Sequence, residues 1–274
     1  MRCWAIEGCG SWGRGLCRWL TEHDERVIEI DRPKRPHRRM GIKDDATDAL
    51  RAAREAMTAT GNGTPRQHGQ RDALAAFQAA RRSAIESATD AERQLLALAN
   101  TAPEQLAVKL RGCTTRTIVT TCERLRTAII TVSSTRAIAE AMQRLAKRIR
   151  LLRAEALSHE KSIAKIVESW KPELLEIAGV GPIVAATVLC AWSHPGRLRN
   201  EAAFAMLAGT APIPASSGQT IRHRLSRQGD RQLNRALHVV CLQRLRHDDR
   251  TKAYAARRRA EGKTEREIRR CLIG

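Results

Sequence analysis

Apolar residues recur at alternating four- and three-residue intervals through the middle of the chain. The series consists of Ile138, Met142, Leu145, Ile149, Leu152, Ala156, His159, Ile163 and Ile166. This spacing places the side chains on one stripe of an α-helix, which is buried against a partner helix. The pattern predicts a coiled-coil segment, in a homo-oligomer or in a long intramolecular hairpin. His159 is interpreted as a polar position of the seam rather than as a ligand.

The chain is strongly basic. It has 49 Lys and Arg residues against 29 Asp and Glu residues, a formal net charge of +20 and a pI near 10.8. Residues 219–274 alone hold 16 basic and 6 acidic residues, and a second basic run spans residues 32–39. Such charge favours a polyanionic partner, because each neutralised phosphate releases condensed counterions. The alternative is a basic protein whose charged runs are only solvated surface.

The eight cysteines form no C-x-x-C pair and show no ligand-like spacing with histidine. This pattern argues against a zinc site and favours free thiols in a reducing compartment. No signal peptide opens the chain and no apolar run reaches the length of a membrane span. We therefore expect a cytoplasmic protein with no membrane partner.

The first 57 residues read as a fragment of an α/β domain. A strand is expected over residues 3–7, a helix from Ser11 to about Thr21 and a second strand over residues 27–31. Ser11 is the expected N-cap, and the core face of that helix is expected to carry Leu16, Trp19 and Leu20. A further helix is expected over residues 45–57.

The predicted fold class is α+β, with mostly helix. The chain divides into a partial α/β domain (residues 1–57), a linker (58–70), a helical and coiled-coil region (71–170) and an all-α C-terminal domain (171–274).

Residues 174–186 fit two helices joined by a Gly-hydrophobic-Gly turn at Gly179 and Gly181. This helix-hairpin-helix pattern is typical of proteins that bind DNA through its backbone. Glycines allow a tight turn, and the N–H groups of the second helix can face a phosphate. The alternative is an ordinary αα-hairpin with a glycine loop.

A loop of small residues, Ser216-Ser217-Gly218, precedes a dense set of arginines. These are Arg222, Arg224, Arg227, Arg231 and Arg235. A serine that attacks DNA needs bound phosphates and neutralisation of the charge that develops on them. Taken alone, the loop is more simply a turn.

Three acidic residues could hold divalent metal ions. Glu7 ends the first expected strand, and Asp45 and Asp48 share one face at the start of the helix over residues 45–57. Carboxylates from a strand end and a helix start can hold magnesium for phosphoryl transfer. The alternative is that Asp45 and Asp48 only complement the helix dipole.

Residues 4–13, 31–33, 41–49, 177–182 and 216–235 together resemble one family over nearly the whole chain. It is the insertion-sequence transposases that have a RuvC-like DEDD domain of RNase H fold and a helical C-terminal domain with a catalytic serine. The resemblance implies that Glu7, Asp45 and Asp48 are the second, third and fourth acids and bind Mg²⁺. It also implies that Ser217 is the nucleophile, with Ser216 as the fallback, and that a structured guide RNA selects the DNA.

In this family the first acid lies on a strand upstream, but no Asp precedes Glu7 in this sequence. We therefore expect an N-terminally truncated RuvC-like domain. The expected function is DNA strand cleavage and exchange in transposition. The alternatives are a nucleic-acid-binding protein without catalysis and a metal-dependent nuclease without a serine step. The residues expected to bind nucleic acid are Gly179, Gly181, Arg222, Arg224, Arg227, Arg231, Arg235, Arg35, Arg38 and Arg39.

Overall fold

The computed structural model describes residues 2–30, 45–58, 63–66, 68–214, 223–224, 226 and 229–273. These residues are mostly helical and include a few short strands, so the α+β, mostly helical fold class is confirmed. The chain forms two compact units. One consists of Met1–Asp72 together with Val188–Gly274, and the other is Ala73–Thr187. The predicted domain boundaries stay a prediction.

The N-terminal part of the first unit is a β-α-β motif. Strands β1 (Cys3–Glu7) and β2 (Arg26–Ile30) pair in parallel, with Cys3 opposite Arg26 and Glu7 opposite Ile30. Helix α1 (Arg14–Glu22) connects them, and α2 (Asp45–Thr58) contacts both strands. A small core between sheet and α1 consists of Ile6, Cys9, Cys17 and Leu20, with Val27 packed against it.

Helix α1 starts later than its sequence predicts. Ser11 is not the N-cap, because its hydroxyl donates to the carbonyl oxygen of Gly8 at 3.3 Å and the helix begins at Arg14. Its buried face carries Cys17 and Leu20, whereas Leu16 is 53% exposed and Trp19 54% exposed. The prediction that Leu16 and Trp19 face the core was wrong, because the sheet covers only the stripe that runs from Gly13 through Cys17 to Leu20. Any side chain at position 13 would lie 2.7 Å from Cγ2 of Ile6.

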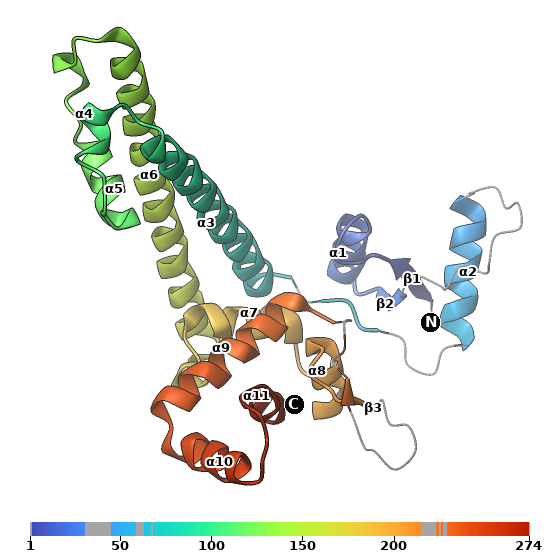
Figure 1. The fold of residues 1–274 in the computed structure, drawn as a ribbon. Helices are drawn as coiled ribbons and strands as arrows, with labels where there is room; N and C mark the ends of the chain where they lie inside the picture. The colour runs from blue at the N-terminus through green and yellow to red at the C-terminus, as the bar shows by residue number, and fades with distance from the viewer. Residues whose placement is uncertain are drawn as a thin grey trace, which may run out of the picture. The chain divides into compact units, whose positions relative to one another are not determined.

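Two long helices, α3 (Gln70–Asn100) and α6 (Ser133–Trp170), form the antiparallel arm coloured teal and green in Figure 1. Two ion pairs join them: Arg81 to Glu160 at 2.8 Å, and Arg153 to Glu92. Around the far end of the arm lie α4 (Glu104–Ala107), α5 (Thr115–Glu123) and the short 3-10 helix η1 (Thr127–Ile129). The partner of the α6 seam is thus a helix of the same chain.

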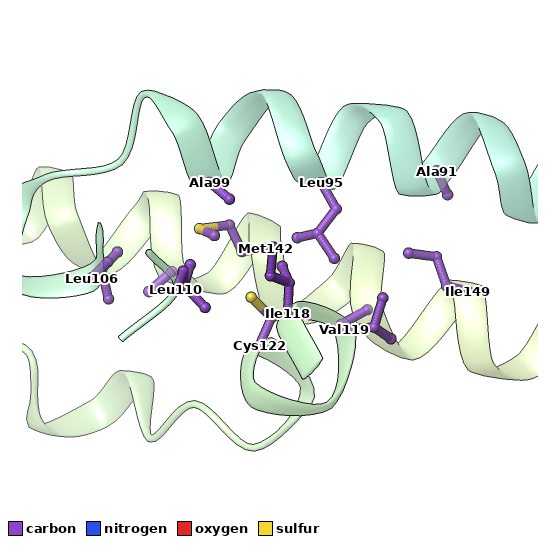
Figure 2. Close-up of a cluster of buried hydrophobic side chains, with 12 residues drawn as sticks. Ala91, Leu95, Ala99, Leu106, Leu110, Ile118, Val119, Cys122, Met142 and Ile149 are labelled. Carbon is purple, nitrogen blue, oxygen red and sulfur yellow. The ribbon is translucent and has the colours of Figure 1, made fainter. Parts of the chain in front are cut away.

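The core of the arm is a contiguous apolar cluster. Figure 2 shows Ala91, Leu95 and Ala99 of α3 pointing toward Met142 and Ile149 of α6. Helix α5 closes the cluster with Ile118, Val119 and Cys122. Met142, Ile149 and Cys122 are fully buried.

Half of the predicted seam is one residue out of register. Met142, Ile149, Ala156 and Ile163 are buried as expected. The alternate buried positions are Ala139, Ala146 and Val167 rather than Ile138, Leu145 and Ile166. Arg153 and Glu160 pair with α3, and His159 has a ring contact with Phe77 of α3. The predicted set is only partly buried and flanks the contact. Small alanines among the buried positions let neighbouring helices pack close to α6.

The C-terminal segment continues through 3-10 helix η2 (Pro172–Glu176), α7 (Pro182–Trp192) and α8 (Glu201–Ala208). Helices α9 (Arg231–His247), α10 (Asp249–Ala260) and α11 (Glu265–Ile273) contact one another in a small bundle (Figure 1). Ala191, Ala208 and Leu233 join α7, α8 and α9 in one core. None of the helices described is long and apolar enough to cross a membrane.

The prediction of an all-α C-terminal domain was wrong at one place. Strands β3 (Ile213–Pro214) and β4 (His223–Arg224) pair in antiparallel fashion, with Ile213 opposite Arg224 and Pro214 opposite His223. Pro214 has no N–H to donate, and a two-residue ladder at a loop neck tolerates it.

Candidate nucleic-acid interface

The turn at Gly179 and Gly181 belongs to the second unit. Gly179 has a φ of 86°, in the left-handed region that favours glycine, and the N–H of Val180 donates to the carbonyl oxygen of Ile177 at 2.9 Å. A side chain at Gly181 would meet no atom within 4 Å, so its backbone is open to a ligand. The element before the turn is the 3-10 helix η2 rather than an α-helix. The helix-hairpin-helix motif stays a prediction.

The start of α9 is fixed against the end of α8. Gly229 has a φ of 104°, and a Cβ there would lie 2.7 Å from both the amide nitrogen of Gly209 and the carbonyl oxygen of Leu207. The N–H of Asp230 donates to that same Leu207 oxygen at 2.7 Å. Asn234 binds the α8 end one residue further on, at Ala208. The first turn of α9 is therefore held by several contacts at once.

Asp230 caps α9. One of its carboxylate oxygens accepts the N–H groups of Gln232 at 2.8 Å and Leu233 at 3.1 Å. Two of the four N–H groups that a helix start leaves unpaired are thereby satisfied.

In the sequence, the predicted nucleophile falls between two described features. The β3–β4 pairing joins residues 213–214 to 223–224. Six residues after Arg224, the cap at Asp230 begins α9. Ser216 and Ser217 themselves lie outside the described residues, as do Arg222 and Arg227. Arg224 is described only as part of β4. The role of Ser217 stays a prediction.

Helices α9 to α11 carry most of the charge of the first unit. Residues 231–273 hold 13 Arg and Lys residues against 5 Asp and Glu residues. Several pair locally, such as Arg258 with Glu261 at 2.6 Å and Lys252 with Asp249 at 2.9 Å. Arg231 and Arg235 are exposed and make no ion pair with any described residue.

The exposed stripe of α9 is continuous. Leu233, Ala236 and Cys241 are buried on one side, and the opposite side carries Arg231, Arg235, Val239 and Arg246. These four residues follow helical spacing of three to four and seven residues, so they share one face. A helix with cations along its outer face suits the phosphates of a nucleic acid.

The three predicted metal ligands are placed on two neighbouring elements. Glu7 is the last residue of β1, and Asp45 and Asp48 lie in the first turn of α2, which contacts β1. Asp48 pairs with Arg51 at 3.3 Å. In the part of the chain that the structure describes, no three His, Cys, Asp or Glu side chains are grouped to hold one metal ion. A shared magnesium site for the three acids stays a prediction.

The basic run with Arg35, Arg38 and Arg39 lies outside the described residues. A different cationic cluster, which the sequence analysis missed, lies in the first unit around Asp72. The Asp72 carboxylate accepts Arg14 at 2.8 Å, His68 at 3.0 Å and Arg71 at 3.0 Å. Burial would raise the pKa of Asp72, but these three hydrogen bonds outweigh it and lower that pKa.

The same cluster includes Arg66 and Arg197. Arg197 donates through Nη1 to the carbonyl oxygen of Ala191 at 2.7 Å. Burial, reinforced by the nearby Arg66 charge, lowers the pKa of Arg197. The sequence gave no signal for this cluster, since its members come from separate segments and follow no motif.

One comparison with known proteins bears on this region. Residues 171–256 match the model of a protein family described as Transposase IS116/IS110/IS902 family. The match runs from the residue before η2 into α10 and includes the β3–β4 pairing and the start of α9. This match supports a transposase function. The search of curated proteins found no match to the chain.

Proposed function

We propose, on the premise of that family match, that the chain is an insertion-sequence transposase that cuts and rejoins DNA. The observation that carries the proposal is that the matched region contains both the β3–β4 pairing and the capped, cationic start of α9. In the sequence, Ser217 falls between these two strands. A nucleophile for DNA needs both fixed placement and nearby cations.

The chemistry assigned to this loop is a phosphoryl transfer with Ser217 as nucleophile. The Ser217 oxygen loses its proton and bonds to the phosphorus of a DNA phosphodiester. The bond from that phosphorus to one sugar oxygen breaks, and the released oxygen takes up a proton. Attack by the hydroxyl of another strand on the phosphoserine ester reverses the process and frees the serine. The number of phosphoester bonds is unchanged, so strand exchange needs no external energy source.

Charge in this region supports binding of nucleic acid. Arg231 and Arg235 follow the loop, and their planar guanidiniums suit bidentate contact with phosphate oxygens. Such contacts serve DNA and RNA equally, and we include a structured guide RNA among the partners, as the resemblance implies. The proposal also includes Mg²⁺ as the cofactor, held by Glu7, Asp45 and Asp48. It further includes a homo-oligomeric state.

The test is a search for a covalent protein–DNA adduct. A labelled duplex carrying the ends of the element is incubated with the chain, with and without the RNA transcribed from the element. Products are separated under denaturing conditions. We expect an adduct with the parent chain and with Ser216→Ala, the matched control, and none with Ser217→Ala. DNA binding should be nearly unchanged in Ser217→Ala, because the hydroxyl serves chemistry rather than affinity.

Loss of the adduct in Ser216→Ala alone would move the nucleophile back by one residue. An adduct that persists in the double variant would refute the serine mechanism. A parent chain that binds the duplex and forms no adduct would be a nucleic-acid-binding protein without this catalysis.

A further inference from the structure

Two guanidiniums of the cluster around Asp72 each have a buried N–H group without an acceptor among the described residues. The Nε–H groups of Arg66 and Arg197 are buried, and neither has a hydrogen-bond acceptor among the described residues. Arg66 makes no ion pair with any of these residues either. Buried donors are nearly always satisfied in folded proteins, so a pair of unsatisfied charged donors in one place calls for an explanation.

Among the described residues, the charges of the cluster do not balance. Four guanidiniums, those of Arg14, Arg66, Arg71 and Arg197, lie near three carboxylates, those of Asp72, Glu29 and Asp230. Asp72 is fully engaged by Arg14, His68 and Arg71. Burial lowers the pKa of Arg197, and the like charge of Arg66 lowers it further. An anion between them would offset that repulsion.

The backbone holds both arginines in position. The segment that carries Arg66 is joined to β2, where the N–H of Glu29 donates to the carbonyl oxygen of Gly63 at 2.8 Å. Arg197 is held at the end of α7 by its bond to Ala191. Next to it, the Nε–H of Arg71 donates to the carbonyl oxygen of Cys190 at 3.3 Å. Three separate segments therefore bring these guanidiniums to one place.

The turn after β1 borders the same place. Nη1 of Arg66 would lie 3.7 Å from a Cβ built on Gly10. Arg66 therefore faces the short loop between the carboxyl end of β1 and helix α1. Arg66 and Arg197 are only half-buried as residues, so part of each side chain stays in contact with solvent.

We propose that Arg66 and Arg197 form a binding site for a backbone phosphate of the nucleic acid on which the chain acts. A phosphate group carries the oxygens that two guanidinium forks can bind in parallel. Its negative charge balances the excess of cations in the cluster. The site lies beside the carboxyl end of β1, apart from the arginines of α9 in sequence. As a nucleic-acid site, it rests on the proposed function.

The experiment has two arms, and the first uses inorganic phosphate alone. The midpoint of thermal unfolding is measured in millimolar phosphate and in chloride at the same ionic strength. Phosphate should raise the midpoint of the parent chain and of Arg93→Gln, an exposed control on α3 paired only with Asp90. Arg66→Gln should show no rise. Arg197→Lys keeps the charge without the fork and should show a reduced rise. Equal rises in all four chains would overturn the site.

The second arm is a salt titration with a fluorescent duplex and a structured RNA. Arg66→Gln should weaken binding about tenfold at low salt and reduce the slope of log K against log salt by about 0.9 on duplex DNA. Arg93→Gln should change neither quantity as much, and circular dichroism confirms that each variant folds. Equal slopes for Arg66→Gln and Arg93→Gln would overturn the proposal while the function stands. A parent chain that binds neither nucleic acid would refute the function, and the phosphate arm would still decide the anion site.

Discussion

The side-chain amide of Asn234 donates a hydrogen bond to the carbonyl oxygen of Ala208 at 2.9 Å. Ala208 ends α8 and Asn234 lies in the first turn of α9, so this bond ties the two helices together across the loop between them. The loop carries Ser217. The start of α9 is therefore positioned by residues that are distant from Ser217 in the sequence.

Gly229→Ala should destabilise the fold strongly. The new Cβ would lie 2.7 Å from backbone atoms of Leu207 and Gly209, and the φ of 104° is unfavourable for alanine. We expect a loss of about 2 to 4 kcal/mol in the free energy of unfolding, measured by urea titration. Gly262→Ala is the control, with a φ of 82° and no atom near the added Cβ. Its loss should be about 1 kcal/mol, and equal losses would contradict the steric argument.

Asp230→Ala should lower the free energy of unfolding by about 1 kcal/mol, because it removes the cap of α9. Asp249→Ala makes the same charge change in the first turn of α10. There the carboxylate is 95% exposed and pairs only with Lys252, so we expect almost no loss. The comparison is made by urea titration of both variants. Similar losses in the two would show that charge rather than capping is responsible.

Replacement of both Arg231 and Arg235 by Ala should weaken binding of all duplexes alike. Each lost phosphate contact reduces the slope of log K against log salt by about 0.9, so we expect a reduction of up to about 1.8. The measurement is a salt titration on two duplexes of unrelated sequence. Arg93 and Arg111, exposed and paired with Asp90 and Glu104, are the control pair. A change confined to one sequence would indicate base reading instead.

His194 should make stability depend on pH. Burial, with help from Arg197, lowers the pKa of this histidine in the folded chain. The unfolded chain therefore takes up a proton first, near pH 6.5, and stability falls as the pH falls through that value. The loss amounts to at most about 1.4 kcal/mol per pH unit from this group. His194→Gln should flatten the dependence between about pH 7.5 and 5, and an unchanged profile would assign it to other groups.

Asp48→Asn should lower magnesium affinity and strand transfer together if Glu7, Asp45 and Asp48 share the ion. Calorimetry measures the binding, and Asp90→Asn on α3 is the matched control. We expect weak binding even in the parent chain, since the described residues bring no three acidic ligands together. Tight binding that ignores both Asp45→Asn and Asp48→Asn would refute the assignment of these ligands.

Sequence patterns predicted the positions of helices and strands better than they predicted which side of each helix is buried. Strand β1 matches its predicted range, and α2 begins at Asp45 as expected. The faces were harder, because the core side of α1 and α6 is decided by what packs against them. On α6, Ala139 and Ala146 are less apolar than Ile138 and Leu145, yet they are the ones fully buried in the core cluster.

The candidate site shows the same limit. The cap at Asp230 and the exposed arginines of α9 could be expected from local pattern, since both depend on neighbours in sequence. Arg66, Arg71 and Arg197 could not, because 131 positions separate the first from the last and only the fold brings them together. Their environment depends on long-range packing of α7 against the start of α3.

The heptad repeat of the α3–α6 arm makes it adjustable in length. Leu74, Arg81, Ala88 and Leu95 on α3 recur every seven residues, as do Met142, Ile149, Ala156 and Ile163 on α6. Removal of one heptad from each helix would bring the tip about 10.5 Å closer to the base and leave every remaining contact in register. Removal of four residues from each helix would instead rotate helix α5 around the axis of the arm. The distance from the tip to the base of the arm can therefore change in steps of two helical turns during evolution.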